Sequence, residues 1–208
     1  MTIINVNNNI LSNADKDLIL NALKSDELIV YPTDTLYGLG VNACSEKAVN
    51  RLYELKERDK SPISVLLEST ENCLDIARDL SNQAVKIIQY FLPGPMTVIC
   101  RSDFPFADQL YSERGTIGMR VPGDNISREI PHLLGSPITT TSVNPRGLPP
   151  ARTISEMRSY FGSEISLILD AGTLAESPGS TVIDLTTHPF KVLREGKITR
   201  QSLRDFLN

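Results

Sequence analysis

Residues 28–62 read LIVYPTDTLYGLGVNACSEKAVNRLYELKERDKSP, and three segments of different character follow one another in this stretch. Leu28 to Tyr31 is apolar throughout, which predicts a buried strand. A turn rich in hydroxyl groups and glycine runs from Pro32 to Gly40, and Glu46 to Glu57 has the apolar spacing of a helix lying on a sheet. Open α/β sheets bind ligands at turns that follow strand ends, so this stretch is expected to form one wall of an anion-binding pocket.

Three cations, Lys56, Arg58 and Lys60, follow at the exit of this helix, two residues apart. In backbone that is becoming extended, such spacing lets them converge on one anion. The alternative is a solvated helix end, because the dipole of a helix favours cations at its C-terminus. The stretch contains no GxxxxGK[ST] loop, and Gly38-Leu39-Gly40 lacks the third glycine of a dinucleotide fingerprint, so a phosphate would bind by another route.

Composition excludes several classes of protein. The 208 residues carry a net charge of −4, which is unlike a general polyanion binder. The three cysteines, Cys44, Cys73 and Cys100, are widely spaced and suggest neither a disulfide framework nor a zinc site. The N-terminal residues do not resemble a secretory signal, and no apolar run reaches 18 residues, so the expected location is cytoplasmic with no membrane span.

Short strands and helices alternate along the rest of the chain, without repeats or low-complexity linkers. This pattern predicts one α/β domain over residues 1–208, with a twisted, mixed parallel and antiparallel open sheet and flanking helices. The further strands are expected at residues 2–6, 62–67, 116–121, 137–141, 166–170, 181–185 and 192–195, with one more directly after the Pro93-Gly94-Pro95 turn. The further helices are expected at residues 12–24, 80–90, 127–134, 154–161 and 199–207.

Hydroxyl groups and arginines gather near several of the predicted strand ends. Thr139 to Ser142 form one run of hydroxyls, which β-propensity alone could also explain. Arg120 and Arg194 each precede a turn, and Arg152 follows a double proline. Together they could surround a triphosphate and a carboxylate with charge-assisted hydrogen bonds. A site with many cations and few general bases suits a reaction whose nucleophile is already an anion.

Seven motifs, in order, carry a resemblance to a known family: YPTDTLYGLG, KERDKSP, LPGPMT, GMRVP, TTTSVNPRGLPPART, PGSTVIDL and LREG. They resemble the YrdC-like threonylcarbamoyl-AMP synthases, in the short, single-domain TsaC form, over residues 10–198. The resemblance implies a mixed sheet with a large concave face where substrates bind. It also implies a nucleotidyltransferase that makes threonylcarbamoyl-AMP and pyrophosphate from L-threonine, bicarbonate and ATP, with Mg²⁺, for N6-threonylcarbamoyladenosine in tRNA.

The same resemblance assigns roles to individual residues. It implies catalytic and phosphate-binding roles for Lys56 and Arg58, and it implies no protein ligand for the metal, since magnesium is expected to bind through the ATP phosphates. The other implied ATP contacts are Lys60, Ser61, Thr116, Asn144, Arg152 and Arg194. The implied threonine contacts are Thr35, Arg120, Ser142 and Ser180.

The sequence also departs from the family pattern. The spacing from Arg58 to Pro62 is one residue shorter than usual, which affects the assignment of Lys60 and Ser61, and Leu66 stands where some members have a histidine that contacts threonine. A downstream tRNA threonylcarbamoyl transferase complex is implied as partner, and direct contact with tRNA is left open. Two alternatives remain: a paralogue with another nucleotide activity, and a non-catalytic RNA-binding module, which the acidic net charge and few aromatic residues disfavour.

Overall fold

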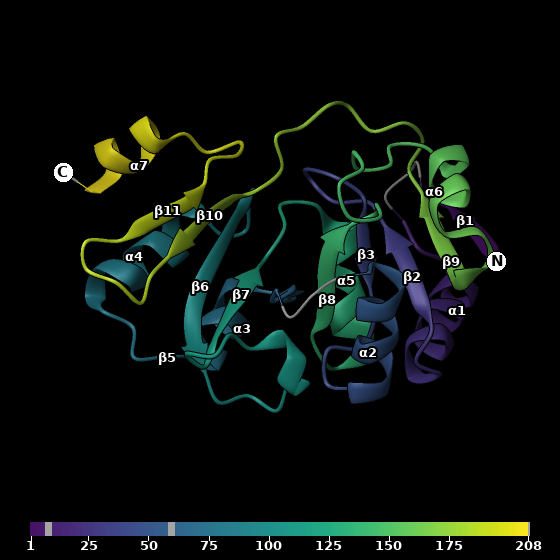
Figure 1. Cartoon of the computed structure of the whole chain (residues 1–208), viewed down its shortest axis with the longest axis horizontal. Helices are drawn as coiled ribbons and strands as arrows, with labels where there is room; N and C mark the ends of the chain where they lie inside the picture. Colours follow the sequence, from purple (N-terminus) through teal and green to yellow (C-terminus); the bar gives the residue numbers. More distant parts are fainter. Residues whose placement is uncertain (7–9, 58–60, 208) are drawn as a thin grey trace.

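The fold is built on one open sheet, seen in a computed structural model that describes residues 1–6, 10–57 and 61–207 (Figure 1). Within these residues the strand order is β1-β9-β2-β3-β8-β4-β7-β6-β10-β11, and β5 pairs with β6. The sheet is mixed, because β9 pairs in parallel with β1 and β2, whereas β3 pairs antiparallel with β2 and β8. The predicted α/β class with a mixed open sheet is therefore confirmed.

The bounds of the elements follow the predicted pattern closely. The strands are β1 (Thr2–Asn5), β2 (Leu28–Tyr31), β3 (Gly38–Gly40), β4 (Ser64–Leu66), β5 (Ala77–Arg78), β6 (Met96–Ser102), β7 (Thr116–Arg120), β8 (Ile138–Ser142), β9 (Ile165–Asp170), β10 (Thr181–Asp184) and β11 (Lys191–Arg194). The helices are α1 (Asn13–Lys24), α2 (Glu46–Leu55), α3 (Thr70–Ile76), α4 (Asn82–Phe91), α5 (Asn125–Leu134), α6 (Ile154–Phe161) and α7 (Arg200–Leu207), with short 3₁₀ turns η1 (Asp108–Leu110) and η2 (Gly162–Glu164).

Two elements correct the expectation from sequence. The segment from Pro32 to Gly40 was expected to be a turn, but its last three residues form β3, between β2 and β8. Two glycines in three residues give little strand propensity, so tertiary pairing decides this strand. Helix α3 was not expected, because its seven residues are too few for a clear periodic pattern.

Tyr31 explains why β3 needs its glycines. The ring of Tyr31 lies against β3, and a Cβ atom added to Gly38 or Gly40 would come within 2.7 or 2.8 Å of ring atoms. The Tyr31 hydroxyl donates to the carbonyl of Thr139 on β8 at 2.9 Å. Burial raises the pKa of Tyr31, so the hydroxyl keeps the proton that it donates. One side chain thus links β2, β3 and β8.

Helices cover both faces of the sheet and leave one concave region open. Ile19 of α1 and Ile130 of α5 pack with Ile29 and Leu66 in one apolar cluster. A larger cluster includes residues of α2, α3, α4 and α6. Figure 1 shows the segment between β9 and β10 crossing from one half of the sheet to the other along the rim. This crossing brings β10 and β11 beside β6, so segments distant in sequence share one concave surface.

A search of the described residues for a helix with the length and apolarity of a membrane span finds none. Of the three free cysteines, Cys73 and Cys100 are buried and Cys44 is half-buried.

The buried Tyr31 hydroxyl yields a test of the strand arrangement. We expect Tyr31→Phe to lower the free energy of unfolding by about 1 kcal/mol, because the carbonyl of Thr139 loses a donor in a dry environment. The matched control is Tyr90→Phe, since the Tyr90 side chain is 68% exposed and keeps its ring contacts. Chemical denaturation of both variants checks the expectation, and equal stabilities would contradict it.

Candidate active site

A cavity of about 1180 Å³ opens on the concave face of the sheet. The alternation of side chains along its strands decides what lines it. On β7, Thr116, Gly118 and Arg120 face the cavity, while Ile117 and Met119 pack in the apolar core. The neighbouring strand β6 does the same with Thr97 and Ile99 toward the cavity. Each strand therefore has one dry face and one face that can bind a polar ligand.

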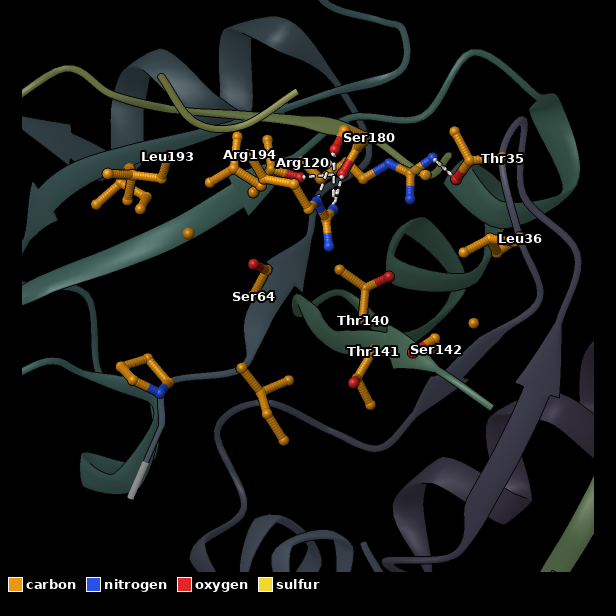
Figure 2. A pocket seen from close by; sticks show the side chains of 18 of the residues that line it. Thr35, Leu36, Ser64, Arg120, Thr140, Thr141, Ser142, Ser180, Leu193 and Arg194 are labelled. Carbon is orange, nitrogen blue, oxygen red and sulfur yellow. Dashed lines mark hydrogen bonds between the residues drawn. The ribbon is translucent and has the colours of Figure 1, made fainter. Parts of the chain in front are cut away.

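Hydroxyl groups are tightly packed in the wall of the cavity. Gly118 lies beside Ser64 of β4, and a Cβ atom at Gly118 would come within 2.4 Å of the Ser64 Oγ atom. The hydroxyls of Thr97 and Ser180 share a hydrogen bond of 2.8 Å across β6 and the start of β10. Figure 2 shows Ser64, Thr140 and Thr141 around the same hollow. The surface offers many hydroxyl donors and acceptors at fixed positions.

Arg120 ends β7 and is buried, with only 8% of its side chain exposed. Its Nη2 atom donates to Thr35 Oγ1 at 2.7 Å and forms an ion pair with the carboxylate of Asp34. A buried guanidinium requires such partners, because an unpaired charge is costly to remove from water. The partners come from the turn between β2 and β3, so this turn is tied to the end of β7.

Arg194 ends β11 on the same cavity. Its Nε and Nη2 atoms donate to the carbonyl of Ser180 at 3.1 and 2.9 Å, and Nη2 also donates to Ser180 Oγ at 3.0 Å. Burial, and then the positive charge of Arg120, lower the pKa of the Arg194 guanidinium below its ordinary value. Two cations that repel each other across one cavity are stabilised by an anion between them.

Lys56, Ser142 and Asn144 form a connected group beside the cavity. Lys56 is the C-cap residue of α2, and its Nζ atom donates to the carbonyl of Ser142 at 2.5 Å. The Ser142 hydroxyl donates to Asn144 Oδ1 at 2.5 Å, and Asn144 Nδ2 donates to the carbonyl of Leu148 at 2.6 Å. The loop that follows β8 is thereby fixed to the end of α2.

The structure brings many of the proposed contacts together and leaves others apart. Those that line the cavity are Thr35, Thr116, Arg120, Ser142, Ser180 and Arg194. Lys56 and Asn144 lie behind this lining, joined to Ser142. Arg152 instead donates to the carbonyl of Leu174 at 2.8 Å and pairs with Glu176. Ser61 is exposed beside Pro62 of the lining, and Arg58 and Lys60 lie outside the described residues.

Several lining residues were not among the proposed contacts. Ser64 and Thr97 are polar residues in the apolar segments PISVLL and MTVIC, and this exception to the apolar pattern was the available signal. Ser112 bonds to Thr116 with an oxygen to oxygen distance of 2.7 Å, but it lies in a loop with no recognisable motif. Sequence reasoning could not find these residues because their positions depend on pairing between distant strands.

Metal ligands are sparse in this cavity. The carboxylates that line it are those of Glu113 and Asp184, and the described residues contain no group of three acidic, histidine or cysteine side chains suited to a metal ion. The hydroxyls and arginines fit a metal ion that arrives on an anionic ligand better than one that the protein holds by itself.

Comparisons with known proteins point to one family. The Sua5/YciO/YrdC family profile, which carries the description "Telomere recombination", matches residues 21–196. The threonylcarbamoyl-AMP synthase of Photobacterium profundum is 30% identical over 182 residues, covering 86% of this chain and 97% of that protein. The one of Photorhabdus laumondii is 32% identical over 153 residues, covering 72% of this chain and 81% of that protein.

Solved structures agree with these sequences. Pyrococcus abyssi Sua5 complexed with L-threonine has a TM-score of 0.92 and 28% identity, and this chain, matched over its whole length, spans 61% of that one. Escherichia coli YciO has a TM-score of 0.81 and 26% identity, with 94% of this chain and 95% of that one covered.

The paired arginines yield a test of anion binding. We expect inorganic pyrophosphate at one hundred times its Kd to stabilise the protein by about 2.7 kcal/mol, which raises Tm by about 5–10 °C. Arg194→Met should lose most of this shift, measured against its own Tm without ligand, while Arg204→Met on α7 should retain it. Differential scanning fluorimetry checks both variants, and an equal shift in the two would contradict the expectation.

Proposed function

Because the chain belongs to the Sua5/YciO/YrdC family, we propose that it is an L-threonylcarbamoyladenylate synthase. In this proposal it is a nucleotidyltransferase that makes threonylcarbamoyl-AMP and pyrophosphate from L-threonine, bicarbonate and ATP. The product serves the N6-threonylcarbamoyladenosine modification of tRNA. The threonine complex of Pyrococcus abyssi Sua5, whose fold this chain shares at a TM-score of 0.92, supports L-threonine as the amino acid substrate.

The observation that carries the proposal is a cavity whose lining combines three guanidinium groups, those of Arg114, Arg120 and Arg194, with a wall of hydroxyls. Arg120 suits the carboxylate of threonine, because a guanidinium matches a carboxylate in shape and charge. Thr35, Ser142 and Ser180 supply hydroxyls for the rest of the amino acid. Arg194 and Thr116, which both line the cavity, suit the nucleotide, and Lys56 lies where it can support the end of β8 that carries Ser142.

The proposal also includes further ATP contacts. We assign Arg58 to the phosphates together with Lys56, and Asn144 to the nucleotide. Lys60, Ser61 and Arg152 complete the assigned ATP contacts; Ser61 is exposed, and Arg152 pairs with Glu176.

The reaction follows from this arrangement. The threonine amine bonds to the carbon of carbon dioxide and gives up a proton to solvent, or it bonds to the carbon of bicarbonate, whose C–O bond breaks with loss of water. Either route yields a carbamate. A carbamate oxygen then attacks the α-phosphorus of ATP, and the bond between that phosphorus and the departing pyrophosphate breaks. The attacking group is already an anion, so positioning and cations lower the barrier without a protein base at this step. The cavity has many hydroxyls that can position substrates and few carboxylates that could act as bases, which is consistent with such a mechanism.

Mg²⁺ enters the proposal with the triphosphate. Glu113 and Asp184 are the acidic side chains on the described lining, and they are too few to hold the ion alone. When bound, the ion neutralises charge on the phosphates.

Partner and location complete the proposal. Threonylcarbamoyl-AMP is a reactive mixed anhydride, so a tRNA threonylcarbamoyl transferase complex must take it up. We propose a cytoplasmic location, since three free cysteines suit a reducing compartment. Two candidates are ranked lower: a family member with another nucleotide activity, and an RNA-binding module. The latter would want an aromatic stacking surface, whereas hydroxyls dominate the described lining.

Pyrophosphate release tests the activity. With ATP, bicarbonate and Mg²⁺, we expect the protein to release pyrophosphate only when L-threonine is added, and mass spectrometry should find threonylcarbamoyl-AMP. L-Alanine is the control amino acid, because it lacks the hydroxyl that the cavity is expected to bind. Pyrophosphate release that ignores threonine would favour a family member with another nucleotide activity.

Lys56 and Arg58 provide a second test. We expect Lys56→Ala and Arg58→Ala each to lower kcat/KM by about 100-fold or more, the usual effect of removing one group that stabilises developing charge. Lys47→Ala is the matched control, since Lys47 lies on the same helix with 82% of its side chain exposed. Circular dichroism must show folded variants, and near-normal turnover in both would refute their catalytic role.

A further inference from the structure

Within the described residues, the guanidinium of Arg120 is bound on one nitrogen only. Its hydrogen bonds to the described residues all leave from Nη2, toward the carboxylate of Asp34, Thr35 Oγ1 at 2.7 Å and Thr33 Oγ1 at 3.4 Å. The Nε atom is buried and has no partner within the described part of the chain. Figure 2 shows one nitrogen of Arg120 directed at Thr35 and another turned toward the open space beside Thr140. Donors therefore remain for a ligand.

Asp34 is held in place from several directions. Its Oδ2 atom accepts from the backbone N–H of Gly123 at 3.0 Å, and its own N–H donates to Asp124 Oδ2 at 3.1 Å. Its backbone carbonyl accepts from Lys197, in the loop after β11. Asp124 is the N-cap residue of α5, so Asp34 is fixed to a helix as well as to two loops. A carboxylate held in this way can fix the group that it binds.

Asp34 lies behind Arg120 rather than in front of it. Thr33, Thr35 and Leu36 line the cavity, whereas Asp34 is absent from the described lining. The carboxylate thus uses the Nη2 side of the guanidinium and leaves the cavity side open. A side chain that competed with the substrate for Arg120 would instead stand in the cavity.

We infer that Asp34 is a positioning residue for the amino acid substrate, in that it fixes Arg120 so that the unpaired donors of its guanidinium receive the threonine carboxylate. The inference rests on the proposed function. An arginine held in one rotamer before binding loses less conformational freedom when the ligand arrives. The negative charge of Asp34 also offsets the repulsion between Arg120 and Arg194, which keeps both cations on one cavity.

The test is Asp34→Asn, which keeps the size of the side chain and removes its charge. We expect KM for threonine to rise about tenfold or more, because Arg120 is no longer fixed, while KM for ATP stays within about twofold. Asp26→Asn is the matched control. Like Asp34, the Asp26 carboxylate accepts a hydrogen bond and pairs with a cation, in its case from a serine and with a lysine, but Asp26 is not part of the cavity lining. Its KM values should equal those of the wild type.

A double substitution separates positioning from general support of the fold. Arg120→Lys should weaken threonine binding, and adding Asp34→Asn to it should cause little further loss, because Asp34 acts through Arg120. Independent effects that simply multiply would overturn the inference. Thermal denaturation of each variant shows whether the protein remains folded under the assay conditions.

Other outcomes also decide the matter. An unchanged KM for threonine in Asp34→Asn, or a parallel rise in the KM values for threonine and ATP, would overturn the inference. A lower KM for threonine would overturn it as well, because it would show that Asp34 competes with the substrate for Arg120. Wild-type protein that releases no threonine-dependent pyrophosphate would refute the proposed function, and the inference with it. Wild-type activity with an unaltered Asp34→Asn variant would leave the function standing and remove only the role of Asp34.

Discussion

Neighbouring side chains of a strand point to opposite faces of the sheet, and the cavity of this protein depends on that constraint. On β6 and β7, Val98, Cys100, Ile117 and Met119 pack in the same apolar cluster as residues of helices α3 and α4, while Thr97, Thr116 and Arg120 face the concave side. The apolar face must be buried for the sheet to be stable, and this burial sets the register of the strands. The same register sets the positions of the polar side chains on the opposite face. Stability of the core and geometry of the site are therefore two consequences of one register.

The cations impose a second level of order on this surface. Lys56 and Arg120 are buried and need partners, which they find on segments distant in sequence: the carbonyl of Ser142 and the carboxylate of Asp34. Arg194, which is more exposed, donates to the carbonyl of Ser180. These partners lie at the end of β8, in the turn after β2 and just before β10. The polar contacts of the site thus join segments that the sheet alone would leave as separate loops.

The sequence predicted the parts of the fold that local patterns determine. The strand Leu28–Tyr31 has its predicted bounds, and α2 ends at Leu55, two residues before the expected end, where Glu57 takes a positive φ of 47°. Strand β3 was missed because its glycines serve the ring of Tyr31, a contact that no local pattern reveals. In the same way Arg120 was expected at a strand end, but its partner Asp34 and its neighbour Leu66 on β4 depend on contacts over long separations in sequence.

The anion binding that we propose for this surface differs physically from binding by a glycine-rich loop. In a phosphate loop, backbone N–H groups and a helix N-terminus hold the anion, so the binding geometry belongs to one short segment. Here the donors are side chains from β7, β11 and the turn after β2, and α2 presents its C-terminus, whose dipole does not favour anions. Charged side chains must supply the attraction that the backbone cannot. This requirement explains why a chain with a net charge of −4 places three arginines on one cavity, and why the partners of Arg120 and Arg194 matter as much as those arginines themselves.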